Sequence, residues 1–220
     1  MRSPLFQALS TLGLAGCCAA AQAFGVLVVD ASGRPVADVV VVLTPTDESI
    51  AGVQAKERPH AQMDQRNKEF VPHILVIEVG TWVDFPNSDT VSHQVYSFSP
   101  VKPFQLPLYK GRAHPPVHFD RPGIVTLGCN IHDSMLGFIF VAGSPWFGKT
   151  DLDGRWQGSD PPPGRYDLRI WSPRIRDTAD NLHRLVDIDG QADRKETFKL
   201  DRKLRAEPGQ PAEGKSWDDY

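Results

Sequence analysis

Short apolar runs, separated by Gly and Pro, make up most of this 220-residue sequence. Runs rich in β-branched and aromatic residues and bounded by turn residues are typical of strands. They predict strands at 26–30, 36–43, 73–79, 81–85, 92–98, 117–119, 123–127, 136–141, 165–171 and 196–200. Residues 182–188 fit either a strand or one face of a short helix, and no helical repeat extends beyond three turns. The pattern therefore predicts an all-β fold.

Three stretches carry more specific expectations. Residues 31–35 contain Gly33 and Pro35 between two apolar runs, which predicts a hairpin. Residues 44–68 are polar and interrupted by prolines, which predicts a linker or irregular loop. The run at 73–79 is apolar at nearly every position, which predicts a strand buried on both faces.

The first 23 residues have the composition of an export signal. Arg2 precedes a small, apolar stretch at 9–21, and the sequence Ala-Gln-Ala at 21–23 offers a cleavage site. The stretch is too short for a permanent membrane span, which takes about 20 apolar residues. Alternatively, residues 14–17 resemble a bacterial lipobox, in which Cys17 would carry a lipid. Both interpretations predict a periplasmic protein, soluble in the first case and lipid-anchored in the second.

Charge and composition exclude some classes of protein. The 24 Lys and Arg against 27 Asp and Glu give a net charge of −3, and this near-neutral balance argues against a nucleic-acid-binding protein, which needs a basic face. Hydrophobic residues at 40% and charged residues at 23% fit a packed globular chain. Beyond residue 200 apolar residues become scarce, which predicts a disordered tail over 201–220.

Export also leaves one cysteine in an unusual situation. The chain has three cysteines, of which Cys17 and Cys18 lie in the leader, so cleavage after Ala23 leaves Cys129 alone. A single thiol in an oxidising compartment indicates an intermolecular disulfide, a reactive thiol, or a thiolate bound to a metal.

A metal is favoured by the residues that follow Cys129. His132 and Met135 come at spacings of three and three, on a predicted loop between two strands. Thiolate, imidazole and thioether ligands suit copper, and two His with one Cys and a weak axial Met form an electron-transfer copper site. His93, near the start of a predicted strand, would supply the second imidazole. The alternative is that Cys129 is a buried core thiol, His132 a surface imidazole and Met135 a core gap-filler.

Residues 62–142 resemble the cupredoxins, the blue copper proteins. The resemblance rests on Phe70-Val71-Pro72, the segment VGTWVDFPN at 79–87, the strand of His93, and FDRPG at 119–123. The short ligand loop is similar to that of amicyanin, and the larger pattern resembles exported cupredoxins described as methylamine utilisation proteins. The resemblance implies a Greek-key cupredoxin β-sandwich that binds copper through His93, Cys129, His132 and Met135. Val125 and Leu127 stand where many relatives have aromatic residues, which implies different packing around the copper.

The flanking segments suggest a second, small β-sandwich. The residues at 29–41 and the segments 150–154 and 163–169 resemble the two halves of carboxypeptidase-regulatory-like β-sandwiches. We therefore expect one such sandwich from residues 24–46 and 146–200, with a docking or scaffolding role, and the cupredoxin domain (62–142) inserted in it. In the alternative, residues 36–43 form the first strand of the cupredoxin domain.

Several other residues have two interpretations. His73, with Met63 nearby, is either an accessory metal ligand or a packing residue at a strand start. His114 and His118 have helical spacing, but the prolines between them prevent a helix. Two amides, Asn87 and Asn130, are either turn formers or hydrogen-bond donors to the thiolate.

The sequence thus predicts a type 1 (blue) copper protein that carries single electrons. The alternative is a copper-delivery protein without a fast redox role. We do not expect an enzyme, because the His-x-His pairs of multicopper enzymes do not occur in the sequence. A redox partner protein of unknown identity is expected at the His132 end, on an apolar patch formed by Ile131, Met135, Leu136 and Pro72.

Overall fold

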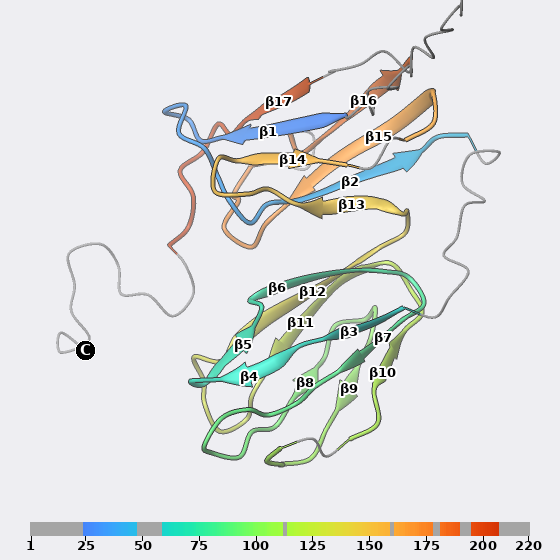
Figure 1. The fold of residues 1–220 in the computed structure, drawn as a ribbon. Helices are drawn as coiled ribbons and strands as arrows, with labels where there is room; N and C mark the ends of the chain where they lie inside the picture. Colours follow the sequence, from blue (N-terminus) through green and yellow to red (C-terminus); the bar gives the residue numbers. More distant parts are fainter. Residues whose placement is uncertain are drawn as a thin grey trace, which may run out of the picture.

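The computed structural model describes residues 24–47, 59–111, 114–158, 161–177, 181–189 and 195–206. The regular elements there are β-strands, which form two sandwiches stacked on one another (Figure 1). The expected all-β class with two sandwiches is confirmed. Within the described residues, no helix has the length and apolarity needed to cross a bilayer. The predicted leader, residues 1–23 with Cys17, lies outside the described residues.

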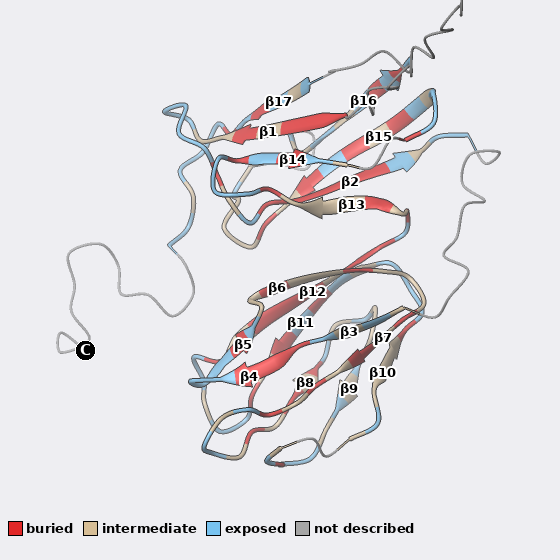
Figure 2. Ribbon diagram, viewed as in Figure 1, coloured by how far each residue is buried: buried red, intermediate tan, exposed pale blue. Residues whose placement is uncertain are grey.

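The lower sandwich is formed by the middle of the chain. Its larger sheet has the order β6 (Ile74–Glu78), β12 (Leu136–Ala142), β11 (Gly123–Gly128), β8 (Tyr96–Ser97) and β9 (Phe104–Gln105). The facing layer has the order β10 (Val117–Phe119), β7 (Thr81–Asp84) and β3 (His60–Gln62), with the pair β4 (Asp64–Arg66) and β5 (Glu69–Val71) beside it. Figure 2 marks in red the buried residues along the strands of both layers.

The upper sandwich combines strands from both ends of the chain. One sheet has the order β13 (Trp146–Lys149), β2 (Val40–Pro45), β15 (Gly164–Trp171) and β16 (His183–Ile188). The other has the order β14 (Arg155–Gln157), β1 (Gly25–Val29) and β17 (Lys195–Lys199). Because β2 pairs with β13 and β15, and β1 with β14 and β17, the segments before and after the lower sandwich share both sheets.

The hairpin expected across residues 31–35 is wrong. β1 and β2 lie in different sheets, and a single bridge between Val29 and Pro35 is all that remains of the pairing. Thr150 holds the crossing between the sheets, because its hydroxyl accepts from the Val39 amide (3.0 Å) and donates to the Val36 carbonyl (2.8 Å). Val36 and Val39 enter the upper core from this crossing, so the apolar run starts before β2 does.

The linker expected at 44–68 is also corrected. Residues 60–66 contain β3 and β4, and Met63, Asp64 and Gln65 are buried in the lower sandwich. The Asp64 carboxylate accepts hydrogen bonds from the Gln65 amide and from Arg66 Nε, so this polar strand is stabilised without apolar residues. Residues 48–58 lie outside the described residues.

The predicted disordered tail is corrected at its first six residues. The Arg205 amide donates to the Arg174 carbonyl (2.8 Å), and the Asp201 amide donates to the Asp177 carboxylate (2.7 Å). Residues 201–206 therefore belong to the upper sandwich, whereas 207–220 lie outside the described residues.

A third apolar layer joins the two sandwiches. Its buried members are Val40, Val42, Ile74, Phe138 and Ala142. The strands β2, β6 and β12 lie between two cores, so that Ile77 faces the lower core while Ile74 faces the layer between the sandwiches. The expectation that residues 73–79 are buried on both faces is thus confirmed.

Candidate metal centre

His93 lies in the segment between β7 and β8, where the chain makes a single β-bridge. Its amide donates to the Tyr109 carbonyl and the Tyr109 amide donates back, both at 3.0 Å. The strand expected at 92–98 is therefore reduced to β8. The side chain of His93 is fully buried (0% exposed), so the ring is held by packing as well as by its backbone.

Cys129 and His132 belong to the loop between β11 and β12. The Met135 amide donates to the His132 carbonyl (3.0 Å), which closes this loop into a tight turn. Gly128 precedes the cysteine, and a Cβ atom there would lie 2.6 Å from Cζ of Tyr96. A glycine is thus required for Tyr96 to pack across the strand end that presents Cys129.

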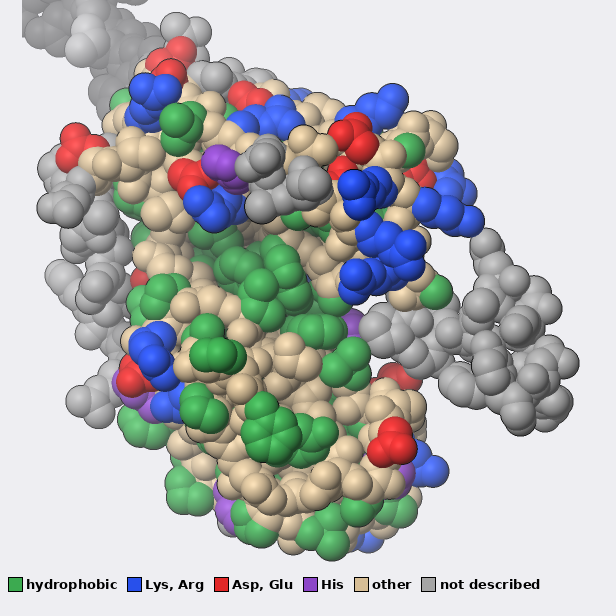
Figure 3. Space-filling model, turned by 180° about the vertical axis from the view of Figure 1, so that it is seen from behind, with side chains coloured by type: hydrophobic (Ala, Val, Ile, Leu, Met, Phe, Trp, Pro, Cys, Tyr) green, Lys and Arg blue, Asp and Glu red, His purple; other side chains and the backbone are tan. Residues whose placement is uncertain are grey.

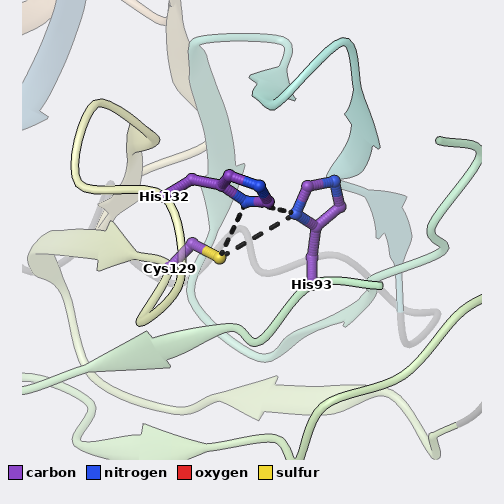
Figure 4. Close-up of side chains that lie close together, drawn as sticks. All are labelled: His93, Cys129 and His132. Carbon is purple, nitrogen blue, oxygen red and sulfur yellow. Dashed lines mark hydrogen bonds between the residues drawn. The ribbon is translucent and has the colours of Figure 1, made fainter. Parts of the chain in front are cut away.

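Three donor atoms converge from these two segments (Figure 4). Nδ1 of His93 lies 3.1 Å from Nδ1 of His132, and Cys129 Sγ lies 3.9 and 3.8 Å from these two atoms. Donors bound at about 2.0–2.3 Å to one ion in a trigonal plane would be separated by roughly 3.5–3.7 Å. The observed separations differ from these values by only a few tenths of an ångström, so the cluster fits a single metal ion.

The other nitrogen of the His93 ring contacts a carboxylate. Nε2 of His93 lies 2.9 Å from Oδ2 of Asp89. The hydrogen bonds from His93 and from the Lys68 amide hold the pKa of Asp89 well below its ordinary value, so the carboxylate is ionised. An ionised carboxylate only accepts, so Nε2 carries the proton and the lone pair of Nδ1 faces Cys129 and His132.

The loop that carries Asp89 is fixed by its own hydrogen bonds. Asn87 accepts from the Asp89 amide (3.0 Å) and donates to the carbonyls of Val91 and Tyr109 (both 2.9 Å). Since both amide protons of Asn87 are used, this residue orders the loop and does not donate to the thiolate. Asn130 is exposed.

His132 differs from His93 in its exposure, being only half-buried. Burial of the ring and the neighbouring His93 lower the pKa of His132 below its ordinary value. A neutral imidazole is the form that binds metals, so the lowered pKa favours binding at neutral pH.

Met135 is buried, in the same core that contains Cys129. The structure thus brings together His93, Cys129 and His132 of the four predicted ligands. The axial contact of the Met135 thioether with a metal at this point stays a prediction.

The remaining histidines named from the sequence have other contacts. His73 packs edge-on against Phe138, with 5.5 Å between ring centroids, and Met63 is buried in the lower core. His114 lies edge-on against Tyr109, and His118 stacks on Trp82. In the described part of the chain, none of these histidines joins the three-donor cluster.

Sequence reasoning missed two supporting residues. Asp89 precedes His93 by four positions, and Tyr109 pairs with the His93 backbone. The acidic residue in the turn before His93 was a usable signal for Asp89. Tyr109 had no comparable signal, since its pairing depends on a connection of sixteen residues (109 − 93).

Comparisons with known proteins give matches to solved structures only, and neither a family profile nor a curated protein matches the chain. A purple cupredoxin from Nitrosopumilus maritimus is 23% identical, over 37% of this chain and 99% of that one, with a TM-score of 0.35. A mutant of amicyanin in its reduced Cu(I) form is 20% identical, over 46% of this chain and 97% of that one, with a TM-score of 0.35. A copper-containing nitrite reductase from Thermus scotoductus is 27% identical, over 44% of this chain and only 25% of the reductase, with a TM-score of 0.36.

Proposed function

We propose that this protein is a periplasmic electron carrier of the cupredoxin type, not an enzyme, and that copper binds to His93, Cys129 and His132 with Met135 as the axial ligand. The observation that supports this best is the convergence of two imidazole nitrogens and one thiolate sulfur within 4.8 Å of one another. This donor set is the one that suits copper in electron-transfer sites. Its periplasmic location rests on the leader alone.

Copper held there supplies one-electron chemistry between Cu(II) and Cu(I). The chain holds the donors in one arrangement: Asp89 fixes the His93 ring, and the tight turn to Met135 fixes Cys129 and His132. Burial of Cys129 and His93 excludes water from two of the donors. Because the donors are already held in place, they need little rearrangement when the charge of a bound copper ion changes by one.

The same burial favours electron transfer over copper delivery. A delivery site exchanges ligands with a partner, so its donors must be reachable from solvent. Cys129 is 4% exposed and His93 is 0% exposed, and only His132 is partly open to solvent. An electron can leave through the edge of the His132 ring, whereas the ion could leave only if the loop opened.

The residues expected from the sequence to form the partner surface need to be revised. Met135 is buried and Leu136 packs against the layer between the sandwiches, so neither is part of an exposed patch. Ile131 is exposed beside His132, and Val91 and Leu108 are exposed next to the segments that hold His93. We propose these three side chains as the redox docking patch, since weak redox encounters use interfaces below about 1,200 Å².

Copper loading tests this proposal directly. Cu(II) added to the metal-free protein is expected to give an intense visible absorption from the thiolate, with a matching electron paramagnetic resonance spectrum. Cys129→Ser should remove this absorption, and Ser134→Ala in the same loop should leave it unchanged. A protein that binds only Cu(I) and stays colourless would support delivery, and unchanged absorption in Cys129→Ser would refute the ligand assignment.

A further inference from the structure

A group of cations lies on the upper sandwich, far in sequence from the metal donors. β15 and β17 belong to different sheets but end on the same side of the sandwich, on the left in Figure 1. The segments that follow them, 172–177 and 201–206, are hydrogen-bonded to each other. The Arg205 amide donates to the Arg174 carbonyl (2.8 Å), and Arg174 Nε donates to the Arg205 carbonyl (3.2 Å). Together they carry the cationic patch, defined as Arg174, Arg176, Arg202, Lys203 and Arg205.

The cationic patch is built on a fixed frame. The Asp177 carboxylate accepts from the amides of Asp201 (2.7 Å) and Arg202 (3.1 Å), which joins the two segments a second time. Ile175 and Leu204 pack against the upper core, one from each segment. The cations are therefore presented by ordered backbone.

Several other cations of this sandwich are paired with carboxylates, whereas, in the described part of the chain, four exposed cations of the patch are not. Arg34, Lys149, Arg169 and Arg184 each pair with a carboxylate of the chain. For the exposed cations Arg176, Arg202, Lys203 and Arg205, by contrast, no carboxylate of the described residues lies within 4.0 Å, the distance limit of an ion pair. Four unpaired cations on two neighbouring segments repel one another, which lowers the stability of the folded chain.

The charge of the rest of the molecule is of opposite sign. The five cations of the patch and the two carboxylates Asp177 and Asp201 sum to 5 − 2 = +3. Because the whole chain carries −3, its remainder carries −3 − 3 = −6. Figure 3 shows Lys and Arg side chains gathered on the upper half of the molecule, on the right in that view.

We propose that the cationic patch is a docking surface for an acidic face of a partner protein. Four of its five cations are arginines, whose planar forks bind carboxylates through two parallel hydrogen bonds. A net −6 on the remainder opposes approach to an extended anionic surface such as a bilayer, whereas a local acidic face meets the patch alone. The proposal does not depend on copper binding, because it rests on the upper sandwich only.

An acidic peptide of eight glutamates is a suitable probe. Titrated into the ¹⁵N-labelled full chain, it is expected to shift the amide resonances of residues 172–177 and 201–206. The triple variant Arg176→Gln, Arg202→Gln, Arg205→Gln should bind it about tenfold more weakly, since it loses three exposed ion pairs. The matched control Arg34→Gln, Lys149→Gln, Arg169→Gln removes the same charge from the same sandwich and should keep the affinity within about twofold.

Two further measurements make the outcome decisive. Replacing the same three arginines by lysine keeps the charge and the fold, and intermediate affinity is expected because lysine lacks the fork. Shifts outside the two segments, or equal losses in the patch and control variants, would overturn the proposal. Binding to vesicles of phosphatidylcholine with phosphatidylglycerol, without binding to the peptide, would assign the patch to a membrane and overturn it as well.

Discussion

Asp89 accepts a hydrogen bond from Nε2 of His93 at 2.9 Å, on the side of the ring opposite the donor cluster. The Lys68 amide donates to the same carboxylate oxygen at 2.8 Å, so Asp89 links the β4–β5 turn to a proposed metal ligand. Contacts of this kind fix the orientation of a ligating histidine and raise its basicity. Asp89 is therefore a positioning residue for the proposed copper site.

Removal of this carboxylate should weaken copper binding. Asp89→Ala leaves the His93 ring without its acceptor, and the expected loss of affinity is about 10–100-fold. Asp89→Asn should lose less, because the amide oxygen can still accept from Nε2. Competition titrations against a chelator of known copper affinity measure both variants. The exposed carboxylate Asp120 gives a control in Asp120→Asn, and wild-type affinity in Asp89→Ala would contradict the assigned role.

The axial role of Met135 has its own test. Met135→Leu keeps an apolar side chain of similar size in the core, so the protein should still fold and keep its visible absorption. Its reduction potential should rise, since the axial ligand tunes the potential and leucine supplies none. Voltammetry of both proteins measures the change. An identical potential in the variant would show that the thioether is not a ligand.

Acid stability should depend on Asp64. Burial alone would raise the pKa of Asp64, but hydrogen bonds from Gln65, Ser88 and Arg66 outweigh it and place the pKa below the ordinary value. A lowered folded-state pKa stabilises the protein above the unfolded-state value of about 3.9, and this contribution is lost as the pH falls through the folded-state value. Urea denaturation at several pH values, with and without Asp64→Asn, measures it.

At neutral pH, Asp64→Asn should lower the free energy of unfolding by about 1–3 kcal/mol, because its amide nitrogen cannot accept from Arg66. The difference from the wild type should begin to shrink below about pH 3.9, where the unfolded wild-type chain takes up a proton, and it should be lost below the folded-state pKa of Asp64. Asp133→Asn, at an exposed position, is the control. A pH-independent difference would mean that the charge of Asp64 is not involved.

The upper sandwich depends on a glycine that cannot be replaced. Gly154 has a φ of +69°, and a Cβ atom there would lie 2.5 Å from the Val28 carbonyl oxygen. Gly154→Ala should therefore cost about 2–5 kcal/mol, from the left-handed backbone and the clash together. Gly33 has a φ of +86° and nothing within 4 Å, so Gly33→Ala should cost only about 1–2 kcal/mol. Thermal or urea denaturation measures both variants. Equal losses of stability in the two would show that the contact with the Val28 carbonyl adds nothing to the cost.

The sequence was most informative where one physical requirement dominated. The apolar run at 73–79 could be assigned to a doubly buried strand because no polar position interrupted it, and β6 is buried on both faces. The loop that carries two of the three clustered donors could be identified because Cys129 and His132 lie only three positions apart. His93 required an inference across 36 positions (129 − 93), and its donor atom lies in the cluster.

The sequence was less informative where long-range contacts decide the structure. The hairpin expectation failed because Thr150, over a hundred residues away, holds the crossing between the sheets. The β4 strand is polar because hydrogen bonds of Asp64 and Gln65 replace apolar burial, which hydrophobic patterning cannot detect. Met135 and Leu136 were expected at the surface, and the fold places them against two different cores.

The layer between the sandwiches constrains how this chain can change over generations. Ile74, Phe138 and Ala142 are apolar because the upper sandwich covers them, although they belong to the outer face of the lower one. In a relative that lacks the flanking segments, the equivalent positions would face water, and selection would favour polar side chains there. The two sandwiches are therefore expected to be inherited together. A lineage that lost one of them would have to replace the apolar side chains on the newly exposed sheet of the other.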